Sequence, residues 1–257
     1  TPSNFFNKLG GEILKSFLLN SMNKLINLLP RRVALASGSG LGTVLYNIVK
    51  LTKFKDTLKN NILTAFPDMS EERAEKIAKQ HAKDLVKTMI EIMRFRELPK
   101  LLKNGKINVE GTEHIEQALA RGQGAILISA HMGNWELLIS IMGLLGYPVH
   151  VIGLEQHDEL ANNFLVKERE RFGTKMIYAK NASNEQVESI LKDNGLILLF
   201  ADHHHYGPRA RNIVDFFGHP VSVPAGPIVY SLRYDVPLIP LFTIRDSVDS
   251  HKVNVES

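Results

Sequence analysis

From residue 107 onward, short apolar or β-branched runs alternate with helical stretches, and this alternation constrains the fold more than any other feature. The runs that we expect to be strands cover residues 107–109, 125–129, 149–153, 175–178, 196–201 and 238–243. The helical stretches cover residues 113–120, 135–145, 159–172, 185–193 and 227–234. Strands that alternate with helices form a mostly parallel sheet with helices on both faces. The sequence therefore predicts an α/β fold with a mostly parallel central sheet, in which ligands bind beyond the carboxyl ends of strands.

The N-terminal region has a different pattern. Between Phe5 and Leu29, apolar residues recur at three- and four-residue steps and are interrupted by lysines and asparagines. This pattern predicts an amphipathic helix over residues 1–29, ended by Pro30, that can lie in a membrane interface. Packing of this helix against the body of the protein is the alternative. Because no run of about 18 apolar residues exists, we predict no transmembrane helix.

Residues 30–100 are also expected to be helical. Small residues between Ala34 and Gly42 suit close helix packing, and a long helix capped by Asp68 or Ser70 is expected to run to about Arg94. No linker separates this part from the α/β part, so we predict one domain over residues 30–257. The sequence stops inside a segment that we interpret as a strand, so the C-terminal end of the domain is expected to be incomplete.

Composition excludes some chemistry. The 257 residues include no cysteine, which excludes a disulfide framework, a thiol nucleophile and a thiolate metal site. The formal net charge is +4, and basic residues gather at positions 31–32, 50–59 and 167–171. Such clusters suit an anionic membrane face or an acidic partner. A nucleic-acid partner is disfavoured because no recognised module is present.

The segment from Ala125 to Glu136 carries the candidate chemistry. A buried strand delivers His131 to its carboxyl end, Gly133 and Asn134 form a tight turn, and a helix follows. Across this corner the carboxylate of Glu136 can fold back onto the imidazole. A carboxylate on one ring nitrogen fixes the tautomer, and the other nitrogen can then take a proton. Amides at the helix start could stabilise an oxyanion. The segment therefore predicts a general-base dyad of His131 and Glu136.

The same residues carry a family resemblance. His131-Met-Gly-Asn-Trp-Glu136 resembles the H-x-x-x-x-D/E motif of the bacterial lipid A late acyltransferases, which add lauroyl or myristoyl chains. Further segments resemble this family in the same order, at residues 60–61, 66–68, 110–114, 202–208, 216–218 and 240–245. The resemblance covers about residues 30–257.

The resemblance implies a glycerol-3-phosphate acyltransferase-like fold and direct transfer without an acyl-enzyme. His131 would be the general base on an acceptor hydroxyl, and Glu136 would orient it. The acyl donor would be a thioester of acyl carrier protein or coenzyme A, without a cofactor. The acceptor would be a lipid A precursor at the cytoplasmic face of the bacterial inner membrane. Some relatives with the same motif acylate phosphoinositide mannosides, so such a lipid is the alternative acceptor.

The resemblance also implies a set of substrate-binding residues. These are Asn134, Arg169, Arg171, Asp202, Tyr206, Gly207 and Arg209. Arginine pairs bidentately with phosphate, which agrees with an acceptor that carries phosphates. The basic clusters agree with an acidic acyl carrier protein and with a phosphorylated lipid.

Three other classes remain as alternatives. A metal-dependent hydrolase could use His203 and His205 beside Asp202, but the spacing matches no helical H-E-x-x-H motif, so we predict no metal site. A serine hydrolase could use Ser129, but no G-x-S-x-G elbow surrounds it. A non-catalytic membrane-binding module would need only the N-terminal helix and the basic clusters.

Overall fold

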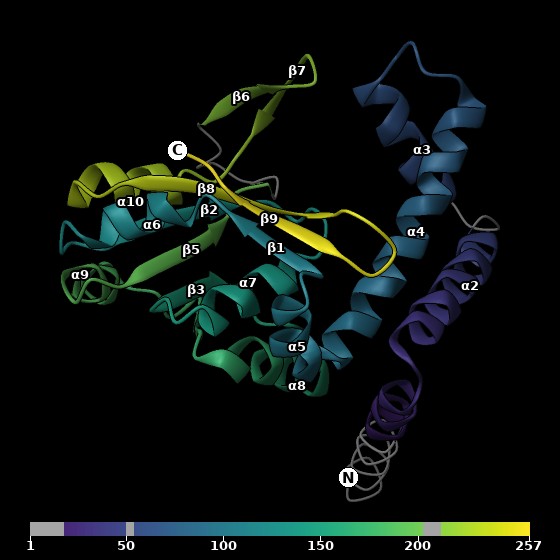
Figure 1. Ribbon diagram of the computed structural model, residues 1–257. Coiled ribbons are helices and arrows are strands. Elements are labelled where there is room, and N and C mark those ends of the chain that lie inside the picture. Colours follow the sequence, from purple (N-terminus) through teal and green to yellow (C-terminus); the bar gives the residue numbers. More distant parts are fainter. Residues whose placement is uncertain (1–17, 50–53, 203–211) are drawn as a thin grey trace, which may run out of the picture.

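The computed structural model describes residues 18–49, 54–202 and 212–257 (Figure 1). Residues 18–28 are helical, which confirms this part of the amphipathic helix predicted over residues 1–29. The rest of that prediction, residues 1–17, lies outside the described residues.

The centre of the fold is a seven-stranded sheet with the order β1-β9-β8-β2-β5-β3-β4. In that order the strands are Ile107–Glu110, His251–Val255, Leu238–Arg245, Ala125–Ser129, Leu196–Phe200, Val149–Gly153 and Lys175–Tyr178. Neighbouring strands are parallel except β8 and β9, which are antiparallel. The predicted mostly parallel sheet is confirmed, and each predicted strand matches an observed one within about two residues at either end.

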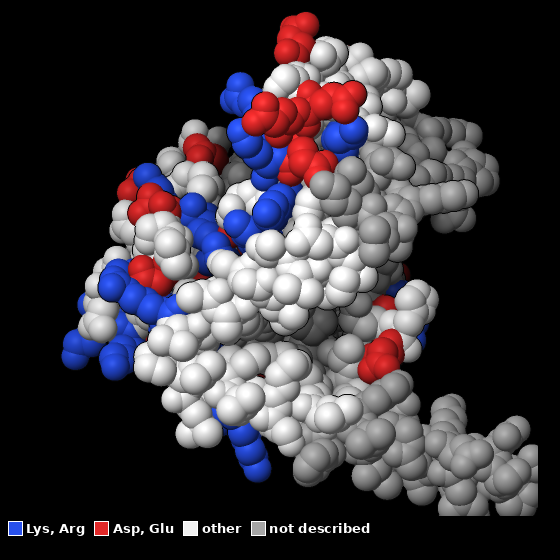
Figure 2. Space-filling view, turned by 90° about the vertical axis from the view of Figure 1, so that its right-hand side faces the viewer, with Lys and Arg blue, Asp and Glu red and all other residues white. Residues whose placement is uncertain are grey.

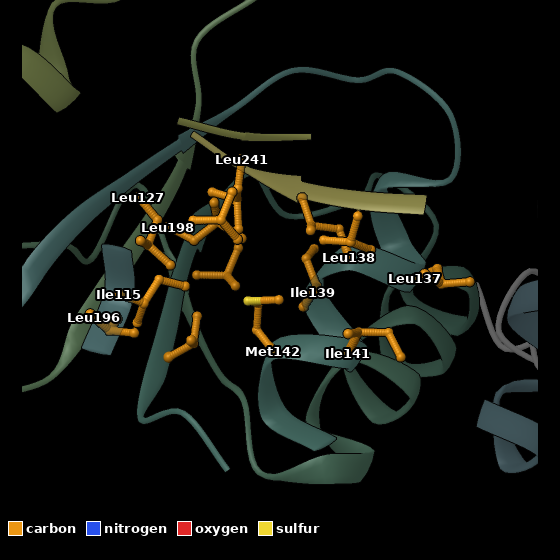
Figure 3. Packing of buried hydrophobic residues seen from close by; sticks show 14 of the residues in the cluster. Ile115, Leu127, Leu137, Leu138, Ile139, Ile141, Met142, Leu196, Leu198 and Leu241 are labelled. Atoms are coloured by element: carbon orange, nitrogen blue, oxygen red, sulfur yellow. The ribbon is translucent and has the colours of Figure 1, made fainter. Parts of the chain in front are cut away.

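Helices cover both faces of this sheet (Figure 1). The bounds are Thr112–Leu119 for α6, Trp135–Leu144 for α7, Glu159–Arg169 for α8, Asn184–Lys192 for α9 and Gly226–Tyr234 for α10. Strand β2 is apolar up to its last residue, Ser129, because it is buried between the two layers. Leu127 on one side of β2 packs in the core with residues of α6, α7 and α8, and Ile126 on the other side packs with residues of α9. Figure 3 shows Leu127 in one apolar cluster with Ile139 and Met142 of α7.

The sequence did not predict a second, two-stranded sheet. It consists of β6 (Ile213–Phe216) and β7 (His219–Ser222), which pair as an antiparallel hairpin and stand off the main sheet in Figure 1. The ring of Phe217 at its turn lies 5.2 Å from the ring of Phe66. This contact joins the hairpin to the turn between α3 and α4.

The N-terminal helices form a separate layer beside the sheet (Figure 1). They are α2 (Arg31–Val49), α3 (Phe54–Ala65) and α4 (Glu71–Met93), followed by η1 (Phe95–Glu97) and α5 (Leu98–Lys103). The predicted close helix packing is confirmed, because a Cβ placed on Gly42 would lie 2.6 Å from the Cα of Lys83 in α4. Of the two capping candidates, Ser70 is the N-cap of α4, and its Oγ accepts from the backbone of Arg73.

The outer side of this layer is apolar. No charged residue occurs between Val33 and Val49, and five large apolar residues of α2 are 42–55% exposed. Helix 18–28 exposes four more, Leu18, Met22, Leu25 and Leu28. Figure 2 looks onto the side of the molecule where α2 lies, and its middle is a broad area without charged side chains. Within the described residues, no helix combines the length and the hydropathy that a membrane crossing needs.

Candidate active site

His131 and Asp202 meet at the carboxyl edge of the sheet. His131 follows β2, Asp202 follows β5, and these two strands are parallel neighbours in which Ser129 pairs with Phe200. The backbone N–H of His131 donates to Asp202 Oδ2 over 2.8 Å, and the ring Nδ1 lies 2.8 Å from Oδ1. One carboxylate therefore holds both the backbone and the ring of this histidine.

The surroundings of the pair favour an ionised carboxylate. Partial burial acts to raise the pKa of Asp202, but the hydrogen bonds from the ring and the backbone of His131 outweigh it and lower the pKa. An ionised Asp202 accepts from Nδ1–H, so the neutral ring carries its lone pair on Nε2. The imidazole also contacts the rings of Phe200 and Trp135, with centroids 4.7 Å and 5.3 Å away. This arrangement presents Nε2 as the proton acceptor of a general base.

The turn after His131 needs glycine at position 133. Gly133 has a φ of +59°, and a Cβ there would lie 2.1 Å from the carbonyl oxygen of Thr243 in β8. A side chain is therefore excluded both by the backbone conformation and by the contact with β8. The predicted strand–turn–helix corner is confirmed at this position.

Asn134 caps the helix that follows. Its Oδ1 accepts from the backbone N–H of Leu137 over 3.0 Å, and its Nδ2 donates to Glu91 in α4 over 3.0 Å. The side chain is fully buried, and both ends of its amide are used inside the protein. The position of Asn134 favours a role in holding the turn. The substrate contact expected from the sequence stays a prediction.

The described partners of Glu136 are Arg169 and Trp135. Arg169 in α8 donates to its carboxylate from Nη2 over 2.5 Å and from Nε over 2.6 Å, and the indole Nε1 of Trp135 donates over 3.1 Å. Sequence reasoning expected this carboxylate on the ring of His131, but the structure places Asp202 on Nδ1 instead. The physical reason is that Glu136 lies in the first turn of α7 and faces α8, whereas Asp202 directly follows β5, the strand next to the one that carries His131.

Both predicted arginines form ion pairs with carboxylates. Burial acts to lower the pKa of Arg169, but the hydrogen bonds and the charge of Glu136 outweigh it and raise the pKa. Arg171 donates to Glu168 from Nε over 2.8 Å. The structure therefore brings Arg169 to the motif through Glu136, while Arg171 pairs within its own turn. Their contact with a phosphate stays a prediction.

The remaining predicted substrate residues, Tyr206, Gly207 and Arg209, lie outside the described residues. His203 and His205 lie there too, so the metal-site alternative that depends on them is not described. Among the residues that the structure describes, no three histidine, aspartate or glutamate side chains gather closely enough to hold a metal ion.

An apolar cavity of about 520 Å³ lies beside the pair. Asp202 and Ala130 are among its lining residues, and most of its wall is apolar. The wall residues come from β2, β8 and the hairpin, and they include Ile128, Phe216, Val221, Leu238 and Phe242. Sequence reasoning missed this cavity. The one local signal of the hairpin is Gly218, a turn residue between apolar residues, and it does not by itself indicate a cavity.

A histidine held by a carboxylate at the carboxyl edge of an α/β sheet, next to an apolar cavity, is typical of a general-base site for a substrate with a hydrocarbon part. Comparison with known proteins agrees with this class. The model of the bacterial lipid A biosynthesis acyltransferase family matches residues 10–256, and the chain belongs to this family.

Individual relatives are distant. The chain is 27% identical over 136 residues to a phosphatidylinositol mannoside acyltransferase of Mycobacterium tuberculosis, covering 51% of this chain and 42% of that protein. The protein of the same name from Mycolicibacterium smegmatis is 27% identical over 143 residues, covering 53% and 45%. A lipid A biosynthesis acyltransferase of Haemophilus influenzae is 25% identical over 171 residues, covering 66% and 52%. The chain thus spans about half the length of the curated relatives it matches.

Proposed function

We propose that this protein transfers a fatty acyl chain from a thioester to a hydroxyl of a membrane glycolipid. The observation that carries the proposal is His131, whose ring Nδ1 and backbone N–H both bond to the carboxylate of Asp202, a residue that lines an apolar cavity. Family membership supports the same reaction. A cavity of about 520 Å³ with a mostly apolar wall suits a hydrocarbon chain.

In the proposed reaction, Nε2 of His131 takes the proton of the acceptor hydroxyl while the hydroxyl oxygen attacks the thioester carbonyl. The negative charge of Asp202 stabilises the imidazolium that forms. The positive end of the α7 dipole lies at the start of the helix after the turn and favours the oxyanion. When the carbon–sulfur bond breaks, the imidazolium returns its proton to the leaving thiolate. No acyl-enzyme and no cofactor take part.

Glu136 has a supporting role in this scheme. Its carboxylate engages Nε and Nη2 of Arg169, and Nη1 lies 3.9 Å from Met176 Sδ, a weak acceptor that an anionic group of the acceptor would replace. The planar guanidinium of arginine has donors that can pair with the oxygens of a phosphate. We propose that Glu136 fixes Arg169 for this contact, and that Arg171, Tyr206, Gly207 and Arg209 contribute further to substrate binding.

The donor is proposed to be a thioester of acyl carrier protein or coenzyme A, and the acceptor a lipid A precursor. A phosphatidylinositol mannoside is the second candidate acceptor, because two of the similar relatives carry that substrate in their names. The proposed location is the cytoplasmic face of the bacterial inner membrane. The exposed apolar residues of helix 18–28 and α2 support association with a membrane surface.

The test is acyl transfer by purified protein in lipid vesicles, with acyl carrier protein and coenzyme A donors and with each acceptor in turn. His131→Ala should lose about 10²- to 10⁴-fold in rate while it still binds the vesicles. His81→Ala, which removes an exposed histidine on α4, is the matched control and should keep full activity. Full transfer by His131→Ala would refute the mechanism, and equal acyl release without an acceptor would indicate a thioesterase.

A further inference from the structure

Glu91 is a buried carboxylate in α4 that is 2% exposed. It accepts hydrogen bonds from Arg31 at 2.8 Å, from His251 at 2.9 Å and from Asn134 at 3.0 Å. Arg245 in β8 donates to both carboxylate oxygens, over 3.0 Å and 2.8 Å. We call these five residues the Glu91 network. It joins α2, α4, β8 and β9 to the residue that caps α7.

The charges in this network explain how a carboxylate remains ionised inside the protein. Burial acts to raise the pKa of Glu91, but the hydrogen bonds and charges of His251 and Arg245 outweigh it and hold the pKa well below its usual range. An ionised carboxylate is acceptor-only, so every group that faces it must be a donor. The amide of Asn134 must therefore present its Nδ2 side to Glu91.

This requirement fixes the orientation of the Asn134 amide. With Nδ2 toward Glu91, Oδ1 faces the backbone N–H of Leu137 and caps α7. The reversed amide would set Nδ2 against that N–H and Oδ1 against the carboxylate, and both contacts would be repulsive. Glu91 thus selects the one orientation in which Asn134 can hold the start of α7.

The turn that carries His131 is fixed from a second side. Gly133 packs closely against the Thr243 carbonyl in β8, and the same strand supplies Arg245 to the network. The network therefore holds both the strand against which the turn packs and the cap at which the turn ends. Glu91 itself lies in the N-terminal helical layer, and among the described residues its hydrogen bonds go to the other members of the network and not to His131 or Asp202.

We infer that Glu91 is a positioning residue, which acts through Asn134 to hold the turn of residues 131–136 in the geometry that places His131. This role rests on the proposed acyl transfer. It also makes the N-terminal helical layer a part of the active-site support, because α4 carries Glu91 and α2 carries Arg31.

A double-mutant cycle tests this inference. Asn134→Ser keeps a cap for α7 but is too short to reach Glu91, and Glu91→Gln keeps the shape but loses the charge. Each variant should lower kcat about 10- to 100-fold with little change in KM for the acyl donor, because a misplaced base slows the chemical step. If Glu91 acts through Asn134, the double variant should have nearly the kcat of the poorer single variant.

Two controls separate positioning from loss of stability. Ser183→Ala removes the cap of α9 away from the site and should lower stability without lowering kcat. All rates are measured well below the melting temperature of each variant. If Glu91→Gln does not fold, the kcat of Asn134→Ser tests the inference. An unchanged kcat in that variant would overturn the inference.

Hydrogen exchange at the Leu137 amide gives a readout that does not depend on activity. Glu91→Gln should speed this exchange more than it speeds exchange at the amides of β5, because the Asn134 amide is then free to reverse, whereas Ser183→Ala should not. Faster exchange in a protein without acyl transfer would count against the proposed function and leave the positioning role standing. Effects on kcat that multiply in the double variant, or exchange that does not change, would overturn the positioning role.

Discussion

Replacing Asp202 by asparagine removes one negative charge and keeps the shape of the side chain. The backbone N–H of His131 donates to Asp202 over 2.8 Å, and the amide oxygen of asparagine can still accept this bond. The amide nitrogen would then face Nδ1 of the ring, in place of the oxygen that lies 2.8 Å away. Because an amide nitrogen is a donor, the ring would turn to the tautomer with its proton on Nε2. That nitrogen could no longer accept a proton.

The size of the effect follows from these two contacts. A hydrogen bond to a charged group is worth about 1.5–3 kcal/mol, and the bond that holds the wrong tautomer adds about 0.5–1.5 kcal/mol. The two ranges sum to about 2–4.5 kcal/mol, and because Asp202 is about one-third exposed, solvent lowers the contribution of the charged bond within that range. At about 1.4 kcal/mol for each factor of ten, we expect kcat to fall about 30- to 1000-fold.

The assay is single-turnover acyl transfer in vesicles, with product measured by mass spectrometry. Asp158→Asn is the matched control, because Asp158 caps α8 through its Oδ1 and asparagine caps equally well. This control should keep full activity. If Asp202→Asn keeps more than half of kcat while Glu136→Gln loses nearly all of it, Glu136 is the orienting carboxylate and the reasoning from geometry is refuted.

Four other predictions concern the same structure. Glu136→Gln should raise KM for a phosphorylated acceptor more than it lowers kcat, because Arg169 loses its bidentate partner; steady-state kinetics with varied acceptor check this. Gly133→Ala should destabilise the protein by at least about 2 kcal/mol in chemical denaturation, because of its positive φ and the contact with β8. Val221→Phe should shift the preferred donor to shorter acyl chains in competition assays, because Val221 lines the cavity. Glu91→Gln should lower the free energy of unfolding by about 3–5 kcal/mol at neutral pH. The folded-state pKa of Glu91 is depressed, so the variant should lose this stability in full at a pH above the ordinary carboxyl pKa of about 4.3. The loss should shrink as the pH falls below that value. Chemical denaturation at several pH values measures this dependence.

Much of the fold is determined locally and could be predicted. Strand β5 and the first four residues of β2 are apolar because both faces of these strands are covered, and this leaves continuous apolar runs in the sequence. The turn at Gly133 is also local, since the strand before it and the helix after it differ sharply in pattern. His131 was therefore found from the sequence, together with the end of the strand that carries it.

The hairpin and the cavity could not be found in this way. Strands β6 and β7 have four residues each, and exposed residues fill β6, so no buried periodicity marks them. The cavity exists because the hairpin packs near β2 and β8. Strand β2 lies far from the hairpin in the sequence. Only the packing of these elements creates its wall.

The sequence by itself determined the alternating elements, the position of His131 at the end of a strand and the family to which the chain belongs. The tertiary structure decided which carboxylate meets the imidazole. Spacing along the chain favoured Glu136, five residues from His131, but parallel pairing of β2 with β5 brings Asp202 to the ring from 71 residues away. In the same way, Glu91 reaches Asn134 across 43 residues through helix packing. A sequence shows only neighbours along the chain, whereas hydrogen bonds form between whichever groups folding brings within about 3 Å.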